Sequence, residues 1–465
     1  MNMINVRRLT VMAFLGAGML PGISAQESPL QADTQNEAKL PAQWDLQSCI
    51  DYALEQNITI RKNRVTAEST QIDVKTAKAA LFPSLSFSTS QQVVNRPYQE
   101  SSSRVSGNEI ISSNSKTSYN GNYGLNASWT LYNGNKRLKT IKQEQLNNHV
   151  AELDVATSEN TIQESIAQVY IQILYAAESV RVNENTLQVS IAQRDRGEQL
   201  LNAGSIAKSD FAQLEAQVST DRYQLVTAQA TLQDYKLQLK QLLELDGENE
   251  MDVYLPNLSD ENVLAPLPTK KDVYVSALAI RPEIEASKLN VEASELGIDI
   301  AKSGYFPTIS LSAGIGTNHT SGSDFTFGEQ VKNGWNNSIG LSVSVPIFNN
   351  RQTKSAVQKA KLQRETSMLS LLDEQKALYK AIEGLWLDAN SAQQRYAAAN
   401  EKLRSTQISY DLISEQFNLG MKNTIELLTE KNNLLQAQQE QLQAKYMAIL
   451  NTQLLKFYQG DKLAL

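Results

Sequence analysis

The chain has 465 residues, of which 20% are charged, and its 43 basic and 50 acidic residues give a net charge of −7. Because no basic stripe rises above this acidic background, the composition argues against a nucleic-acid partner. The one cysteine, Cys49, excludes an intramolecular disulfide, and we expect it to be a small core residue on a helix face.

Residues 1–25 have the pattern of an export signal. Arg7 and Arg8 precede an apolar run, Leu9–Leu20, that is too short to span a bilayer. Small residues around Ala25 offer a cleavage site, so we expect residues 26–45 to form an N-terminal linker.

The rest of the chain repeats one plan. The segment Ala80–Ser86 returns as Gly304–Ser310, and the turn Asn202-Ala203-Gly204 returns as Asn418-Leu419-Gly420. The spacing between matches is longer in the first copy, so its hairpin is the longer one. A duplication of this size indicates two copies of one structural unit.

Each copy is predicted to contain a strand hairpin between helices. The first repeat covers 46–245, with helices over 46–81, 135–201 and 209–245 and a hairpin over 84–132. A linker with three prolines follows at 246–270. The second repeat covers 271–458, with helices over 271–305, 351–418 and 424–458 and a hairpin over 308–347, and a tail occupies 459–465. Each of the two longest helices extends roughly 100 Å at 1.5 Å per residue.

The predicted helices carry a narrow apolar stripe with 3-4 spacing. Phe211, Leu214 and Val218 begin one such stripe, and the other faces are rich in Gln, Asn, Ser and charge. A narrow stripe favours helices side by side in a wall that is wet on both surfaces, because a solid bundle needs a wider apolar face. An ordinary two- or four-helix coiled coil is the alternative.

Four segments alternate with period two, around 85–89, 119–131, 309–315 and 339–347. One face is almost wholly apolar and the other is Ser, Asn or Gly, over about ten residues, a length that crosses a bilayer when tilted. We therefore expect one face to contact membrane lipid, with aromatic residues near the strand ends as an interfacial girdle. The predicted lipid-facing and girdle residues are Tyr123, Trp129, Tyr132, Leu341 and Phe348.

Four strands are too few to enclose a channel, and open sheet edges are not tolerated in lipid. We therefore expect identical chains to pool their strands. The alternative is a small soluble β-domain with one wet face, but its polar face would then lack the usual charges.

The chain offers no constellation for catalysis, cofactor binding or metal binding. Its two histidines, His149 and His319, have no partner at metal-ligand or catalytic spacing, and no glycine-rich phosphate loop is present. We expect neither an enzyme nor a cofactor.

Two tip turns, residues 204–210 and 420–426, join the helices of each repeat. Gly204 and Gly420 are expected to close the preceding helices in a left-handed conformation. Ser209 and Thr424 are the expected N-cap hydroxyls. The acids that follow them, Asp210 and Glu426, would then lie in the first turn of the next helix, where the helix dipole favours negative charge.

The chain closely resembles the outer-membrane efflux protein family, the TolC-like exit ducts of Gram-negative bacteria. The resemblance covers nearly all of the mature sequence and rests on the duplicated plan, the helix-to-strand junctions Leu81–Leu85 and Tyr305–Ile309, and the tip turns. It implies a mainly α protein: a homotrimer with a twelve-stranded outer-membrane barrel on a long periplasmic α-helical barrel. A belt around the middle of this helical barrel would consist of residues 246–270 and the C-terminal tail after Tyr458. It also implies docking to a periplasmic adaptor protein and an inner-membrane transporter.

The resemblance also implies roles for the tip turns. Glu426 matches an acid of the periplasmic constriction, and Lys422, Ser209 and Asp210 match a latch that holds the entrance shut. A second acid of the family is replaced by Thr429, and an aromatic hydroxyl of the latch by Phe417.

The predicted function is a passive exit duct for small molecules. An exit duct for a type I protein secretion system has the same fold and is the first alternative. A structural coiled-coil or adhesion protein with a small β-head is the second.

Overall fold

The computed structural model describes residues 41, 43–98, 102–106, 109–113, 116–246, 251–256, 263–321 and 325–464. The predicted export signal, residues 1–25, and most of the predicted linker over 26–45 lie outside the described residues, as does part of the 246–270 segment.

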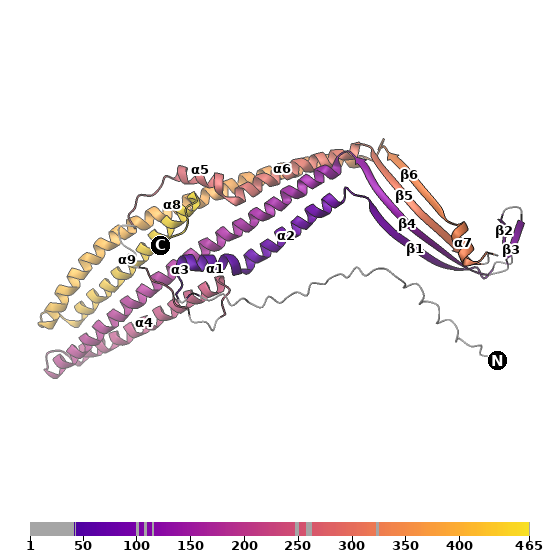
Figure 1. Cartoon of the computed structure of the whole chain (residues 1–465). Helices are drawn as coiled ribbons and strands as arrows, with labels where there is room; N and C mark the ends of the chain where they lie inside the picture. Colours follow the sequence, from indigo (N-terminus) through magenta and orange to yellow (C-terminus); the bar gives the residue numbers. More distant parts are fainter. Residues whose placement is uncertain are drawn as a thin grey trace, which may run out of the picture. The chain divides into compact units, whose positions relative to one another are not determined.

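The helices and strands follow the same overall plan twice, with two helices, a strand hairpin and two helices, and only the insertions within the hairpins differ (Figure 1). The elements of the first repeat are α1 (Leu46–Gln56), α2 (Ile58–Ala79), β1 (Ser84–Asn95), β2 (Ser102–Ser106), β3 (Glu109–Ser113), β4 (Thr117–Asn133), α3 (Lys136–Asn202) and α4 (Lys208–Leu242). Those of the second are α5 (Lys270–Ile280), α6 (Pro282–Lys302), the 3₁₀ turn η2 (Ser303–Tyr305), β5 (Thr308–Thr320), α7 (Phe327–Asn333), β6 (Asn336–Ser344), α8 (Gln352–Asn418) and α9 (Thr424–Gln459).

Short helices lie end to end along each long helix. Helix α3 packs against α2 and α4, and α8 packs against α6 and α9. The two repeats meet where α3 contacts α6 and α9 and where β4 pairs with β5.

The helix predicted over 46–81 is broken at Asn57, and the helix predicted over 271–305 is broken at Arg281. The Asn57 side-chain oxygen accepts a hydrogen bond from Thr59 N at 2.9 Å and so caps α2, while its amide donates to Leu242 O at 3.0 Å. At the equivalent break, Pro282 occupies the first turn of α6, where its missing N–H has no helical partner to lose. Both predictions of one continuous helix were wrong because these local caps compete with the periodicity.

Two described pieces of the linker, residues 251–256 and 263–270, cross the helices near their middle and are called the belt below. Trp44 and Val253 form a parallel bridge, and the Tyr170 hydroxyl donates to Tyr254 O at 2.6 Å. On α8, the Gln393 amide donates to Val263 O at 2.9 Å and the Trp386 indole donates to Pro268 O at 3.0 Å.

The largest apolar core lies beneath the belt, where α1, α3, α4, α8 and α9 converge. Cys49 is fully buried there with a free thiol, which confirms the prediction of a small core residue, and burial raises its pKa to about 12. The core members with the largest fully buried side chains are Tyr170, Tyr396, Ile166, Ile173, Leu174, Leu239 and Leu243.

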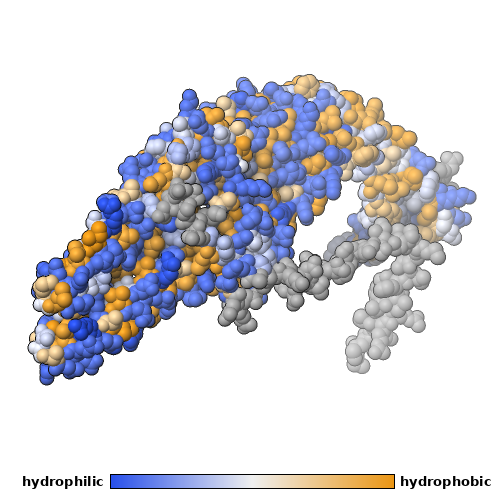
Figure 2. All heavy atoms as spheres, turned by 60° about the vertical axis from the view of Figure 1, so that its left-hand side comes forward, coloured by the Kyte–Doolittle hydropathy of each residue, from blue (hydrophilic) through white to orange (hydrophobic). Residues whose placement is uncertain are grey.

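The helix surface is largely hydrophilic. On the face drawn in Figure 2, hydrophilic residues dominate over the helices, and hydrophobic ones gather over the strands. Among helices of the described residues, none is both long and apolar enough for a bilayer-spanning segment.

Candidate functional site

The four-stranded sheet has the antiparallel order β1-β4-β5-β6 and presents an apolar face. Across three neighbouring strands, Trp129 pairs with Leu311, and Leu311 pairs with Leu341. Since directly paired residues point to the same side of a sheet, these side chains form one row. Tyr123 lies six residues before Trp129 in β4 and therefore on the same face, where it pairs with Thr317.

This apolar face is exposed within one chain. The exposed apolar side chains of the face include Leu85, Phe87, Val93, Tyr119, Leu125, Trp129, Ile315, Ile339, Leu341 and Val343. Serines, asparagines and glycines alternate with them on the other face. Single soluble proteins rarely leave so many neighbouring apolar side chains uncovered, which indicates an apolar environment for this face.

A β-bulge places Tyr132 on this face in place of Leu131. The register of β4 against β5 shifts between Thr130 and Tyr132, so that Tyr132 pairs with Ile309 and Leu131 is the extra residue. The simple alternation predicted through Leu131 is therefore wrong at its last step. Just before the bulge in the sequence, the Trp129 indole donates to Leu81 O at 2.7 Å, and this hydrogen bond attaches β4 to the helix-to-strand junction.

The last strand of the second hairpin is shorter than predicted. Strand β6 ends at Ser344, opposite Thr308 at the start of β5, because no partner strand extends further and Pro346 cannot donate a ladder hydrogen bond. Phe348, predicted for the girdle, therefore lies beyond the strand with its side chain exposed.

The loop of this hairpin contains a short helix, α7, which the sequence prediction missed. Helix α7 is held by a capping box between Thr326 and Glu329 and by a hydrogen bond from Thr317 Oγ1 to Val331 O at 2.7 Å. The His319 ring stacks on Tyr123 and meets Phe327 edge-on, so the loop folds back on the apolar face.

Both tip turns close with a glycine in the left-handed conformation. Gly204 has φ +70° and Gly420 has φ +76°. Ser205 N donates to Leu200 O and Met421 N to Gln416 O, each at 2.8 Å, which is the pattern of a Schellman motif. The prediction for the two glycines therefore agrees with the backbone.

The predicted N-cap hydroxyls were wrong. Helix α4 begins at Lys208, so Ala207 is its N-cap and Ser209 lies inside the helix. Asn423 caps α9: its side-chain oxygen accepts from Glu426 N at 2.9 Å, and Glu426 accepts from Asn423 N at 3.2 Å. Both N-cap residues have extended backbone, but only Asn423 caps its helix with its own side chain; at α4 the Asp210 carboxylate instead accepts from Ala207 N at 3.4 Å.

The predicted constriction acid and the predicted latch lysine pair with each other. Lys422 Nζ lies 2.5 Å from Glu426 Oε1, one helical turn away. This hydrogen bond, together with the one from the Asn423 backbone, lowers the pKa of Glu426 below its usual range. Among the described residues of a single chain, no hydrogen bond or ion pair joins Lys422 to Ser209 or Asp210.

A buried polar cluster near the tips was missed from the sequence. Ser190 of α3, Asp221 of α4 and Lys431 of α9 are 2%, 1% and 3% exposed. The Lys431 ammonium pairs with the Asp221 carboxylate and donates to Ser190 Oγ at 2.5 Å, and Ser190 Oγ donates to Asp221 at 2.5 Å. Burial lowers the pKa of Lys431, and the hydrogen bond that Lys431 donates to the Asp221 carboxylate opposes that shift.

The cluster ties the two repeats together, since Ser190 and Asp221 belong to the first and Lys431 to the second. The sequence contains a feature that could have predicted this cluster. Lys431 lies between Leu427 and Leu434, at a position where the 3-4 spacing requires an apolar residue. A buried charge at such a position requires a partner of opposite sign.

The described residues contain no group of three or more His, Cys, Asp or Glu side chains that could hold a metal ion. His149 pairs with Glu152 across one turn of α3 and is exposed, and His319 belongs to the aromatic contacts of the second hairpin.

Comparison with known proteins identifies the family. The sequence model of the family described as "Outer membrane efflux protein" matches residues 49–244 and 273–460, one range in each repeat and together most of the chain. Outer membrane efflux protein BepC of Brucella suis is 24% identical over 294 residues, which are 63% of this chain and 61% of that protein. Outer membrane protein TolC of Escherichia coli is 24% identical over 315 residues, 65% of this chain and 62% of that protein.

These two matches span about three fifths of the relatives' own length. The solved structure of the outer membrane protein VceC of Vibrio cholerae superimposes with a TM-score of 0.72 at 17% identity, covering 90% of this chain and 97% of that chain. The fold class predicted from the sequence is thereby confirmed. The match over both repeats, on the same helix–hairpin–helix plan, shows that this chain belongs to the outer membrane efflux protein family, the channels of the Gram-negative outer membrane.

Proposed function

We propose that three copies of this chain form a passive exit duct through the outer membrane. The observation that carries the proposal is the sheet: its apolar face is exposed, and its outer strands β1 and β6 both have an open edge within the chain. Lipid tolerates neither an open edge nor an unpaired backbone group. Pairing β6 of one chain with β1 of the next, three times, would close a twelve-stranded barrel.

The helices supply the periplasmic part of the proposed duct. Helices α3 and α8 have 67 residues each, which corresponds to roughly 100 Å at 1.5 Å per residue. Their narrow apolar stripes and polar remaining faces suit a wall with water on both sides. In this arrangement Tyr123, Trp129, Tyr132, Leu341 and Phe348 would contact lipid or its interface.

The tip turns would form the periplasmic entrance. Three Glu426 carboxylates would line the constriction, each partly neutralised by Lys422 of its own chain. Contacts of Lys422 with Ser209 and Asp210 of a neighbouring chain would complete the latch, since the single chain leaves Asp210 without a basic partner among the described residues.

The cargo we propose is small molecules, delivered by an inner-membrane transporter through a periplasmic adaptor protein that docks on the tips. The duct itself would do no chemistry and use no cofactor, so its energy would come from these partners. Names of relatives such as "Antibiotic efflux pump outer membrane protein ArpC" and "Cation efflux system protein CusC" support small cargo.

The test is to purify the protein from outer membranes in a mild detergent, determine its mass by light scattering and insert it into planar bilayers. A mass of three chains and discrete single-channel conductance would support the duct. A monomeric, water-soluble rod without conductance would favour the structural coiled-coil alternative. A trimer that co-purifies with a protein-exporting transporter would replace small-molecule efflux by protein secretion.

A further inference from the structure

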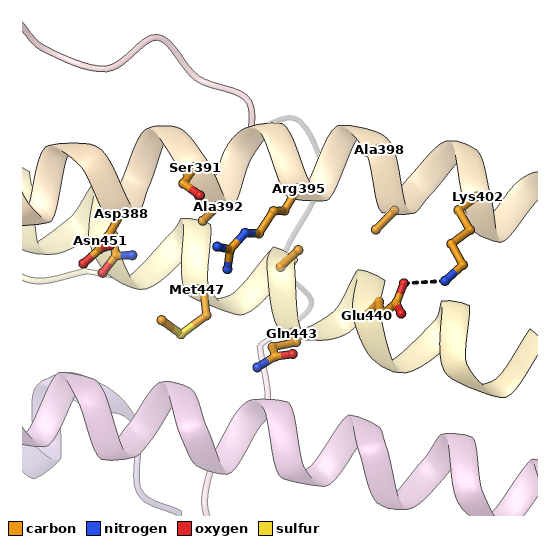
Figure 3. A pocket seen from close by; sticks show the side chains of 12 residues that line it. Asp388, Ser391, Ala392, Arg395, Ala398, Lys402, Glu440, Gln443, Met447 and Asn451 are labelled. Carbon is orange, nitrogen blue, oxygen red and sulfur yellow. Dashed lines mark hydrogen bonds and ion pairs between the residues drawn. The ribbon is translucent and has the colours of Figure 1, made fainter. Parts of the chain in front are cut away.

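A groove with a cavity volume of about 480 Å³ lies between α8 and α9 (Figure 3). Asp388, Arg395 and Lys402 line it from α8, and Glu440, Met447 and the buried Asn451 line it from α9. The groove exists because small residues line the seam between the helices: Ala392, Ala399 and Ala444 are buried at its floor. The volume is in the range of pockets that hold small organic ligands.

The groove has two hydrogen-bond donors to spare. Lys402 Nζ lies 2.7 Å from Glu440 Oε2, so these two charges compensate each other (Figure 3). Among the described residues, no carboxylate or carbonyl pairs with the Arg395 guanidinium. Asn451 is 5% exposed, and its buried Nδ2 has no hydrogen-bond acceptor in the described part of the chain. An unpaired buried donor is costly, so a ligand oxygen would be favoured here.

The groove lies on the side of α8 that faces away from the belt. Trp386 and Gln393, seven residues apart, bind the belt, whereas Asp388 and Arg395, also seven apart, line the groove. Each groove residue lies two positions after a belt-binding residue, and two residues correspond to about 200° around a helix of 3.6 residues per turn. The belt and the groove are therefore on opposite surfaces of the helical wall.

We propose that this groove is a binding site, on the inner wall of the duct, for small amphiphilic molecules that carry a carboxylate or another anionic group. The anionic group pairs with Arg395, and the apolar body lies over Met447 and the alanine floor. The site rests on the proposed function, because only the closed barrel turns this surface toward the lumen.

The remaining charge, Asp388, orients the ligand. It lies two helical turns, about 10 Å, from Arg395, which is close to the screening length at physiological ionic strength. Its repulsion at the Arg395 end is therefore weak, while a direct guanidinium–carboxylate contact is strong and directional. The anionic group would bind near Arg395 with the uncharged body toward Asp388.

The test is a binding titration on the purified detergent-solubilised trimer, with dansylglycine as the anionic probe and dansylamide as its uncharged analogue. Fluorescence anisotropy reports both. We expect dansylglycine to bind more tightly than dansylamide, and Arg395→Gln to weaken dansylglycine about tenfold while leaving dansylamide unchanged. Met447→Glu, which places a negative charge in the groove, should weaken dansylglycine as well.

Arg404→Gln is the matched control, because Arg404 is an exposed arginine of the same helix that pairs with Glu401 at 3.5 Å outside the groove. Equal affinity of wild type and Arg395→Gln for dansylglycine, or the same loss in Arg404→Gln, would overturn the site. A trimer that conducts but does not bind the probe refutes the groove alone, whereas a protein that forms neither trimer nor channel refutes the proposed function.

Discussion

Lys422 and Glu426 form an ion pair across one turn at the start of α9, with 2.5 Å between ammonium and carboxylate oxygen. Because the Lys422 hydrogen bond is the main reason that the pKa of Glu426 is lowered, the pair sets the charge of the proposed constriction. Removing Lys422 would leave Glu426 charged and uncompensated at neutral pH, and would return its pKa toward the ordinary carboxyl value.

Lys422→Ala should therefore make the channel more cation-selective at pH 7, because three uncompensated carboxylates attract cations. This added selectivity should disappear as the pH falls through the ordinary range of a glutamate, about 4.3. Reversal potentials in a salt gradient between pH 3.5 and 7 measure both effects. Lys288→Gln, which removes an exposed Lys–Glu pair of α6, should change neither.

The latch between neighbouring chains makes a separate prediction. If Lys422 of one chain also binds Asp210 of the next, Lys422→Ala and Asp210→Ala should each raise single-channel conductance, and the double variant should add little to either. Additive increases, or unchanged conductance in both single variants, would rule out contact between these two residues.

The buried cluster predicts a strong asymmetry between single and double substitutions. Lys431→Ala leaves the Asp221 carboxylate buried without a counter-charge and should cost about 3–5 kcal/mol of stability. Lys431→Met with Asp221→Leu removes both charges and should cost less, about the 1–3 kcal/mol of the buried Ser190 hydroxyl that loses both partners. Lys402→Ala, which breaks the exposed pair with Glu440, should cost at most about 1 kcal/mol. Denaturant midpoints of the purified variants provide the comparison, and equal losses for the single and double variants would contradict it.

Two glycine substitutions should have opposite effects on stability. Gly420→Ala should destabilise by about 1–2 kcal/mol, because φ is +76° there while nothing crowds a new Cβ within 4 Å. Gly384→Ala, in the interior of α8 and equally uncrowded, should stabilise by about 0.5–1 kcal/mol. Thermal unfolding of the two variants tests the signs, and a stabilised Gly420→Ala variant would mean that the turn does not need the left-handed conformation.

Periodicity made most of the fold predictable. The 3-4 spacing located the long helices α3 and α8, and the period of two located β4, β5 and β6. Periodicity does not predict where a helix ends, because a side chain that hydrogen-bonds to the backbone can end or cap a helix within an unbroken apolar pattern. Asn57 ends α1 with its own cap, and Asn423 takes the cap position from Thr424.

The apolar periodicity also does not predict contacts between segments that are distant in the sequence. Lys431 meets Asp221 only once α9 packs on α4, and the groove beside Arg395 exists only because alanines from α8 and α9 face each other. The tip glycines were predictable because glycine is the residue that most readily adopts the left-handed conformation that closes a helix. The partners of Lys422 were not, since one ammonium can reach several carboxylates.

The most direct test of the account is whether the apolar face of the sheet touches lipid. The chain has four tryptophans, so single-tryptophan variants that retain only Trp129 or only Trp386 report on the sheet and on the helices. In bilayers of phosphatidylcholine brominated on its acyl chains, the fluorescence of Trp129 should be quenched. The fluorescence of Trp386, whose indole donates a hydrogen bond to Pro268 O of the belt, should not be quenched. Quenching of neither tryptophan, or of Trp386 alone, would contradict a membrane-spanning sheet and the duct built on it.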